Sequence, residues 1–329
     1  MNIATVNPGA ETRRRVILLL QYGLPAAFLV WCGFAFRRDL QLLSWEPLLR
    51  SWDIVALAAL LSVVNYLLRA LRWRYYLGRL RYHIGFRFAL LTFVAGFAYT
   101  LSPGKIGELA RARYYRSHGI SLGSVTSAFL AERLMDVTIV VILAAVWSVG
   151  SQRYQSIIIA VSITIASVLL LLATLPWAAL AQRLRSSRSI PEPIRLRIEN
   201  ACTALAAARV LFRPTALAFG FSIGLVAWGL EAYGLGILSN LFPQIHLDLT
   251  AAVGIYGVAL LAGGLSMVPG GLGSAEAVMT TLLVSQRFAV SEALMITMAC
   301  RLVTLWLAVL LGWIAVFLLR QTRQPALAP

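Results

Sequence analysis

The chain has 329 residues, of which 60% are hydrophobic and only 13% are charged, and its mean hydropathy is +0.79. Soluble domains carry about 25% charged residues, so this composition excludes a soluble enzyme. The 29 Lys and Arg residues outnumber the 13 Asp and Glu residues, which gives a net charge of +16. Because these basic residues flank long apolar runs, they indicate the cytoplasmic loops of a membrane protein and no nucleic-acid partner. The cysteines at positions 32, 202 and 300 lie far apart, with no CxxC pair and no histidine cluster nearby, so we expect no disulfide and no bound metal. We expect no cofactor either.

Apolar runs long enough to cross about 30 Å of hydrocarbon predict an all-α polytopic integral membrane protein with six full transmembrane helices. These spans lie near residues 16–36, 53–71, 121–149, 156–178, 214–238 and 289–319. The first run follows Arg13–Arg15, as in a signal peptide. It is about 21 residues long and ends without a small-residue cleavage site, so we expect an uncleaved span. The pair Gly220 and Gly224 predicts close helix packing in the span 214–238.

Two further apolar segments, residues 86–102 and 250–268, end in Pro and Gly and are each followed by a second helical stretch. A broken helix at bilayer depth frees backbone groups that lipid cannot satisfy, so such breaks occur where they line a polar cavity. We therefore predict two re-entrant helical hairpins. The residues of the two breaks are Pro103, Gly104 and Gly107 in the first, and Pro269, Gly270, Gly271 and Gly273 in the second.

The basic residues predict how the chain is oriented in the membrane. Most of them fall before residue 16, within 69–87, 105–116 and 183–213, and after residue 319. Since cytoplasmic loops collect Lys and Arg, both termini are expected in the cytoplasm, with the protein in a bacterial inner membrane. The loop from residue 182 to residue 213 carries several arginines among apolar residues. It is either an amphipathic surface helix held against anionic lipid headgroups or a solvated basic loop.

The two breaks belong to an internal repeat. Residues 103–107 and 269–273 share the pattern PG-x-[IL]-G, and Arg133 and Arg301 follow them at nearly the same distance along the chain. In the predicted topology the hairpins enter from opposite sides, so the repeat is inverted, which is typical of transporters with a binding site near the midplane. The alternative is that PG turns simply end helices and that the two arginines coincide by chance. We predict four regions along the chain: an N-terminal span and periplasmic loop (residues 1–52), the first repeat with its hairpin and the basic loop (53–210), the second, inverted repeat with its hairpin (211–320), and a cytoplasmic tail (321–329).

Charged residues within predicted spans are candidates for the functional site, because a charge at the bilayer centre costs at least about 2.5–3.5 kcal/mol. Glu132, Arg133 and Asp136 lie on neighbouring turns and are expected to form a small ion network. Glu108 is the expected partner of Arg133, and Glu276 that of Arg301. The predicted substrate-binding residues are Lys105, Glu108, Glu132, Arg133, Asp136, Glu276 and Arg301. The alternative is that these ion pairs only lock helices together, and Glu231 fits either interpretation equally well.

Four stretches together resemble one membrane family. They are residues 69–74 (RALRWR), residues 102–108 (SPGKIGE), Glu132-Arg133-x-x-Asp136 and residues 268–276 (VPGGLGSAE). Over about residues 50–320 the chain resembles the lysylphosphatidylglycerol synthase transmembrane-region family, the flippase-like membrane domain of multiple peptide resistance factors. In two-domain members of that family, this domain is thought to move aminoacylated phosphatidylglycerol to the outer leaflet, and a soluble domain attaches the amino acid.

The resemblance implies lipid translocation without lipid aminoacylation, because the chain stops at Pro329, before any synthase domain. The lipid is expected to be similar to aminoacyl-phosphatidylglycerol, related to hopanoids, or a glycolipid. Arg133, Arg301 and Lys105 would hold its phosphate, and Glu108, Asp136 and Glu276 its cationic or hydroxyl groups.

Two alternatives to transport stay open. The first is a non-transporting membrane subunit that docks a lipid-modifying enzyme or glycosyltransferase through its basic loops. The second is a membrane transferase, for which Glu108 is the only candidate acid. We expect no enzyme, because the sequence contains no phosphate loop, zinc motif or nucleophile elbow.

Overall fold

The computed structural model describes residues 46–148, 174–186 and 191–321, together with residues 156, 159–160, 162–164, 167 and 170–172. The predicted span 16–36 lies outside the described residues, and so do eight of the 23 residues of the predicted span 156–178 and nearly all of the tail 321–329. Residues Pro47–Pro329 form one compact unit. The regular elements of the described chain are helical, as predicted.

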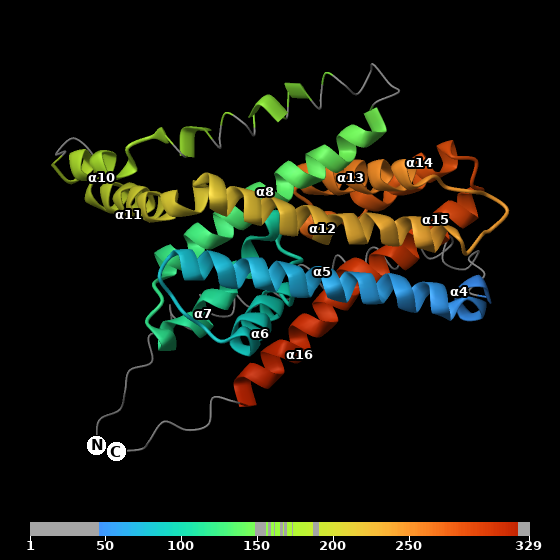
Figure 1. Ribbon diagram of the computed structural model, residues 1–329, viewed down its shortest axis with the longest axis horizontal. Coiled ribbons are helices and arrows are strands. Elements are labelled where there is room, and N and C mark those ends of the chain that lie inside the picture. Colours follow the sequence, from blue (N-terminus) through green and yellow to red (C-terminus); the bar gives the residue numbers. More distant parts are fainter. Residues whose placement is uncertain are drawn as a thin grey trace, which may run out of the picture. The chain divides into compact units, whose positions relative to one another are not determined.

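Figure 1 shows the helices in chain order. The first half contains α4 (Glu46–Arg50), α5 (Trp52–Arg79), α6 (Phe86–Phe97), the 3₁₀ helix η2 (Pro103–Arg111), α7 (Ala112–Tyr115), η3 (Arg116–His118) and α8 (Leu122–Ser148). Then come α10 (Trp177–Ser186), α11 (Glu192–Ala208) and η4 (Arg209–Phe212). The second half contains α12 (Pro214–Ser239), α13 (Leu249–Leu265), η5 (Pro269–Gly271), α14 (Ser274–Ser285), α15 (Val290–Arg301), the π-helix η6 (Leu302–Trp306) and α16 (Leu307–Gln321).

Three helical stretches of the described chain are long and apolar enough to cross a membrane, namely Trp52–Arg79, Pro214–Ser239 and Val290–Gln321. They agree with three of the predicted spans. The helix α8 has a comparable length of 27 residues and carries the predicted charges in its middle. The helix α5 ends at Arg79, well beyond the predicted end at residue 71. It continues because Arg72 and Tyr76 in this extension are buried against other helices.

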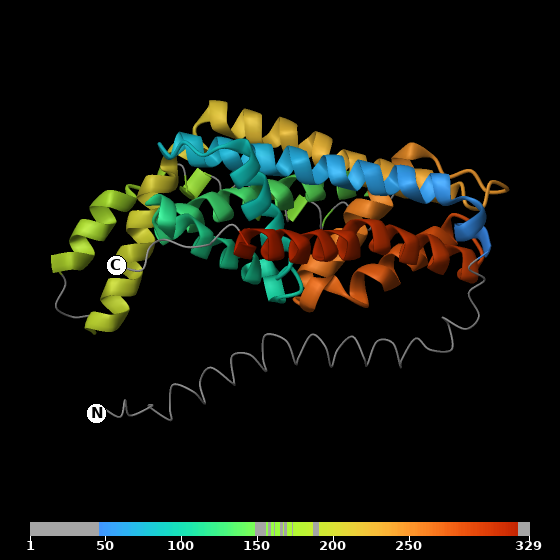
Figure 2. The same ribbon diagram turned by 90° about the horizontal axis from the view of Figure 1, so that it is seen from below.

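Glycines allow the long helices to approach closely. The helices α5 and α12 run side by side in both views (Figures 1 and 2). A Cβ atom at Gly220 would lie 2.1 Å from the Tyr76 hydroxyl, and one at Gly224 would lie 2.6 Å from Arg72 Nη1. The predicted role of this glycine pair in helix packing is therefore confirmed. Between α8 and α13, a Cβ at Gly257 would lie 2.4 Å from the backbone nitrogen of Ala144.

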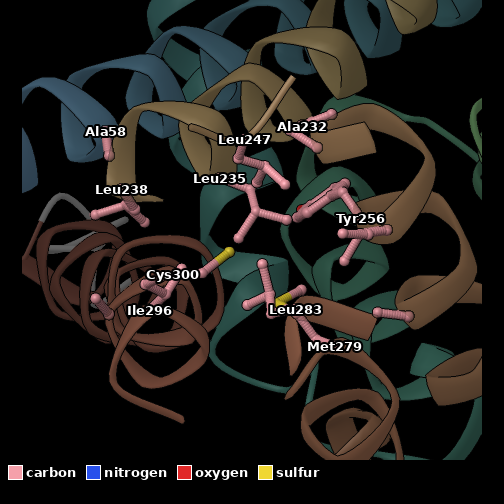
Figure 3. Close-up of a cluster of buried hydrophobic side chains, with 14 of the residues drawn as sticks. Ala58, Ala232, Leu235, Leu238, Leu247, Tyr256, Met279, Leu283, Ile296 and Cys300 are labelled. Atoms are coloured by element: carbon pink, nitrogen blue, oxygen red, sulfur yellow. The ribbon is translucent and has the colours of Figure 1, made fainter. Parts of the chain in front are cut away.

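An apolar core joins α5 to the helices of the second half (Figure 3). Leu235 and Leu238 of α12 are fully buried; Leu235 lies near Tyr256 of α13, and Leu238 lies near Ala58 of α5. Leu283 of α14 and Ile296 of α15 belong to the same cluster. Inside a bilayer, lipid is as apolar as these side chains, so close van der Waals packing stabilises this core more than the exclusion of water does. This core packs α13 and α14, which flank the second break, against α12.

Both predicted breaks are present. After α6, the chain turns and continues as η2, in which Lys105 has a φ of 57° and the Gly107 nitrogen donates a hydrogen bond of 2.6 Å to Ser102 Oγ. At the second break, Gly270 and Gly271 both have a φ of 65°, a conformation that glycine adopts without steric cost. The helix–break–helix pattern is thus confirmed, whereas re-entry from opposite membrane faces stays a prediction.

The two breaks meet inside the protein. The segments η2 and η5 contact each other, and a Cβ atom at Gly270 would lie 2.7 Å from Leu101 Cδ2. Two segments that are far apart in the sequence therefore form one irregular backbone region, in which η2 also contacts α8 and η5 also contacts α13. Such a meeting point is where an inverted repeat would place a binding site.

The described residues of the basic loop between the two halves form two helices, α10 and α11, where one of the two predictions expected a single amphipathic surface helix. Pro191 precedes α11 and interrupts helix formation there, since proline lacks the backbone N–H that a continuous helix needs. Arg185 of α10 forms an ion pair with Glu199 of α11. The helix α11 is anchored to α8 by a hydrogen bond of 2.8 Å from Ser127 Oγ to the Ala204 carbonyl oxygen.

Candidate functional site

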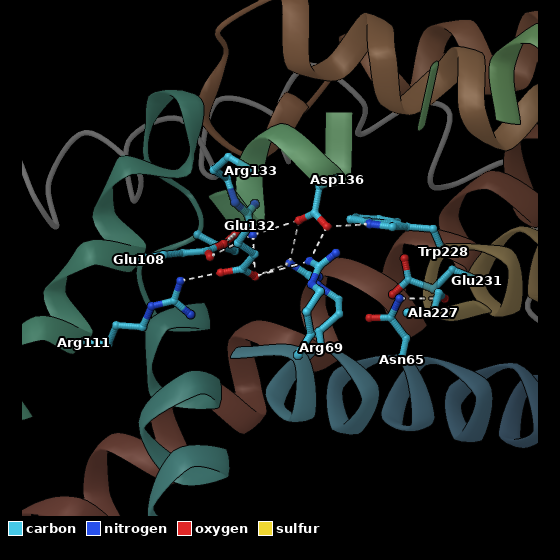
Figure 4. Close-up of polar contacts among 12 residues, drawn as sticks. Asn65, Arg69, Glu108, Arg111, Glu132, Arg133, Asp136, Ala227, Trp228 and Glu231 are labelled. Atoms are coloured by element: carbon cyan, nitrogen blue, oxygen red, sulfur yellow. Dashed lines mark hydrogen bonds and ion pairs between the residues drawn. The ribbon is translucent and has the colours of Figure 1, made fainter. Parts of the chain in front are cut away.

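A cluster of buried ion pairs surrounds the middle of α8 (Figure 4). The Glu132 side chain is fully buried and accepts hydrogen bonds from Arg111 Nη2 at 2.7 Å, Arg133 Nη2 at 2.9 Å and Arg69 Nη2 at 3.4 Å. These arginines come from η2, α8 and α5. A single carboxylate therefore joins three segments of the first half.

Asp136 lies one turn further along α8 and has its own set of donors. Arg72 Nη2 contacts Asp136 at 2.5 Å, Arg133 at 3.0 Å and Arg69 at 3.3 Å, and Trp228 Nε1 of α12 donates at 3.0 Å. The predicted network of Glu132, Arg133 and Asp136 is therefore confirmed. The predicted pair of Arg133 and Glu108 is also present, with a distance of 3.6 Å.

Three arginines of this cluster belong to basic stretches from which cytoplasmic loops are predicted. They are buried inside the protein and are not exposed in loops, and the orientation in the membrane stays a prediction. Arg69, Arg72 and Arg111 are 3%, 0% and 0% exposed and belong to the ion cluster. Arg111 also lies over the Trp73 ring, with its guanidinium carbon 3.7 Å from the ring centroid. A charge at membrane depth must be paired. Glu132 and Asp136 share one neighbouring arginine on α8, so the sequence already indicated that a further cation from another segment was required.

The second centre lies at the other break. Arg301 Nε contacts Glu276 Oε1 at 2.6 Å, which confirms the predicted pair. Arg301 Nη2 also donates a hydrogen bond of 2.6 Å to the carbonyl oxygen of Gly270, whose backbone angles within the short η5 are not helical. The first residue of the π-helix η6 follows Arg301 directly, and the Tyr66 hydroxyl donates a hydrogen bond of 2.6 Å to the Thr304 carbonyl oxygen. No Pro or Gly in residues 300–306 signals this π-helix in the sequence.

A cavity of about 350 Å³ lies where the two breaks meet. Its polar wall contains Lys105 from the first break, Arg133 and Asp136 from α8, and Arg301 beside the second break. The remaining wall is mostly apolar and is formed by α8, α13 and α12. Val137 and Leu265, which line the cavity, are 44% and 73% exposed, so the cavity reaches the protein surface between α8 and α13.

The structure separates the predicted site residues into two groups. Lys105, Arg133, Asp136 and Arg301 line the large cavity. The other three are one layer behind it: Glu108 lines a smaller adjoining cavity, Glu132 is enclosed by arginines, and Glu276 is paired with Arg301. Contact of any of these residues with a substrate stays a prediction.

The cavity region carries more positive than negative charge. The described side chains around the first break are five cations and three carboxylates, namely Arg69, Arg72, Lys105, Arg111 and Arg133 against Glu108, Glu132 and Asp136. The ammonium of Lys105 forms no ion pair with a described residue, and it lies 5.8 Å from the centroid of the Trp228 ring. This arrangement favours an anion in the cavity, because unpaired cations at membrane depth are costly.

Comparison with known proteins places this arrangement in a family. The family model described as "Lysylphosphatidylglycerol synthase TM region" matches residues 16–312. The chain belongs to this family. It is also 28% identical over 282 residues to a "UPF0104 membrane protein" from Methanothermobacter thermautotrophicus, an alignment that covers 79% of this chain and 82% of that protein.

The match to the lysylphosphatidylglycerol synthase TM region includes both breaks, the ion cluster and Arg301. It confirms the resemblance found in the sequence and identifies the chain as a membrane protein. In the part of the chain that the structure describes, no three His, Cys, Asp or Glu side chains are grouped so that they could hold a metal ion.

Proposed function

We propose that this protein moves an anionic lipid headgroup across the inner membrane through the cavity between the two breaks. The observation that carries the proposal is the excess of cations on a cavity at the meeting point of two interrupted helices. In transporters built from inverted repeats, substrates bind where such interrupted helices meet.

A phosphodiester headgroup fits the charges of the cavity. Lys105 carries an unpaired ammonium among the described residues, and Arg133 and Arg301 each keep one face on the cavity while paired with carboxylates. Charge-assisted hydrogen bonds from these groups would replace the water that the phosphate loses on leaving the membrane surface. The apolar opening beside Val137 and Leu265 would leave the acyl chains in lipid.

The carboxylates have different roles in this proposal. Asp136 lines the cavity and is available to a hydroxyl or ammonium group of the headgroup. Glu132 and Glu276 position arginines, since each is held in an ion pair away from the cavity wall. Glu108 connects Arg133 with the smaller adjoining cavity.

Leaflet transfer of fluorescent lipids in proteoliposomes tests this proposal. The lipids are phosphatidylglycerol, lysyl-phosphatidylglycerol and a polyprenyl-phosphate glycolipid. Arg301→Ala is expected to slow transfer at least about tenfold, because a hydrogen bond to a charged group contributes about 1.5–3 kcal/mol. Arg197→Ala is the matched control, since Arg197 is an exposed arginine of α11, outside the cavity.

Two results would contradict the proposal. One is that the folded wild-type protein moves none of the three lipids, which would favour a subunit that docks a lipid-modifying enzyme through its basic helices. The other is equal transfer by the wild-type protein and Arg301→Ala, which would place the transport path elsewhere.

A further inference from the structure

Glu231 of α12 is a buried carboxyl group with an unusual environment. It is 5% exposed, and the Tyr256 hydroxyl donates a hydrogen bond to its Oε2 atom. Within the described part of the chain, no Lys or Arg lies within ion-pair distance of Glu231. By contrast, the buried carboxylates of Glu108, Glu132 and Glu276 each have an arginine partner.

The Glu231 side chain lines a second cavity that adjoins the main one. A smaller cavity of about 50 Å³ is lined by Glu231 and by polar groups of Tyr66, Thr100 and Thr304. A volume of this size accommodates one or two water molecules, and its polar wall provides their hydrogen-bond partners. Lys105 and Arg301 line both cavities, so they lie between Glu231 and the place of the headgroup.

Titratable and charged groups face Glu231 from each element packed around it. They are Tyr66 and Arg69 of α5, Lys105 and Glu108 of η2, Tyr256 of α13, and Cys300 and Arg301 of α15. On its own helix, Trp228 lies one turn away and donates to Asp136 of α8. The cations in this set are the same ones that the main cavity offers to an anion.

We propose that Glu231 is a proton-binding site that couples proton movement to headgroup movement. This inference rests on the proposed function. An unpaired carboxylate at membrane depth is costly, so Glu231 is stable either with a bound proton or with a cation facing it. Lys105 and Arg301 can serve either Glu231 or a phosphate in the main cavity.

The consequence is that the anion and the proton favour each other's binding. When a phosphate engages Lys105 and Arg301, these cations no longer stabilise the Glu231 carboxylate across the smaller cavity. Glu231 then takes a proton from a hydronium ion: one O–H bond of the hydronium breaks, one forms on the carboxylate, and a water molecule is left. When the phosphate leaves, the O–H bond breaks and the proton returns to water. By thermodynamic linkage, proton binding to Glu231 strengthens phosphate binding by the same factor by which phosphate binding strengthens proton binding. One proton therefore moves with one lipid anion in the same direction, and no net charge is carried.

The test uses the full chain in liposomes with a trace of fluorescent phosphatidylglycerol and a gradient of one pH unit. Potassium and valinomycin hold the membrane potential at zero, and protein-free liposomes provide the baseline. One-to-one coupling predicts about a tenfold enrichment of the lipid in the leaflet that faces the alkaline side, since one pH unit equals a factor of ten. Without a gradient, the two leaflets are expected to hold equal amounts.

Glu231→Gln is expected to move lipid with no enrichment, because the amide keeps the size of the side chain and cannot take up the proton. Asp248→Asn is the matched control, since the Asp248 side chain is 78% exposed at the start of α13, away from both cavities. This variant is expected to keep the full enrichment.

The outcomes separate this inference from the proposed function. If the wild-type protein moves lipid and shows no enrichment under the gradient, the proton site is wrong and the transport proposal stands. If it moves no lipid, the transport proposal fails first. Enrichment that persists in Glu231→Gln also overturns the inference. If Glu231→Gln moves no lipid, the Glu231→Asp variant is measured instead, because it keeps a carboxyl group. Enrichment by Glu231→Asp supports the inference, and loss of enrichment or of lipid transfer in this variant overturns it.

Discussion

Removal of the Asp136 carboxylate tests whether the buried ion cluster depends on charge balance. In the Asp136→Asn variant, Arg72, Arg133 and Arg69 lose the negative charge of a carboxylate whose oxygens lie 2.5, 3.0 and 3.3 Å from their nitrogen atoms. The cluster then has five cations for two carboxylates. Breaking a buried ion pair by removing one partner costs about 3–5 kcal/mol, and we expect a loss of this size in the free energy of unfolding.

A second substitution isolates the electrostatic part of this loss. Arg72 is fully buried, and its Nε and Nη1 atoms have no hydrogen-bond partner in the described structure. Replacing Arg72 by Met in the Asp136→Asn background removes the cation that has lost its partner. We therefore expect the double variant to recover at least about 2 kcal/mol relative to Asp136→Asn alone.

Unfolding by sodium dodecyl sulfate in mixed micelles provides the free energies for this double-mutant cycle. Glu192→Gln is the control, because Glu192 is an exposed carboxylate in the first turn of α11, and no change beyond about 0.5 kcal/mol is expected there. Strictly additive losses from Asp136→Asn and Arg72→Met would refute the reasoning, since they would show that the two charges do not stabilise each other.

Two further substitutions test the packing of the helices. Gly257→Ala is expected to cost about 1–3 kcal/mol and to lower the melting temperature in detergent, because its Cβ would lie 2.4 Å from the backbone of α8. Gly264→Ala on the same helix is the control: a Cβ at Gly264 would have no atom within 4 Å, so the melting temperature should not fall. Tyr66→Phe removes the 2.6 Å hydrogen bond to the Thr304 carbonyl oxygen and is expected to cost about 1–3 kcal/mol and to speed amide hydrogen exchange in the π-helix. Tyr233→Phe, at an exposed tyrosine of α12, should change neither quantity, and equal exchange in both tyrosine variants would contradict the role of Tyr66.

The pairs that the sequence predicted correctly share a simple physical origin. A charged residue inside an apolar run must find a partner, so Arg301 required an acid, and Glu276 beside the second break was available. The same reasoning found Glu108 for Arg133. Pro and Gly interrupt helices through local backbone properties, so both breaks could also be located without tertiary information.

Other features depend on which helices are neighbours. Arg69, Arg72 and Arg111 look like membrane-surface charges in the sequence, because each lies in a basic stretch at the end of an apolar run. Their burial follows from the approach of α5 and η2 to the two acids of α8. The π-helix after Arg301 likewise has no local signal, since its freed carbonyl groups are stabilised by Tyr66 from another helix.

By itself, the sequence determined that this is a helical membrane protein with two interrupted helices and charges at membrane depth. These features depend on hydropathy and on the backbone of Pro and Gly, which act within a few residues. The tertiary structure decided that the two breaks meet, that four arginines surround Glu132 and Asp136, and that Glu231 has no cationic partner among the described residues. Those outcomes require helices far apart in the sequence to pack together, and long-range contacts of this kind are not encoded in any local pattern.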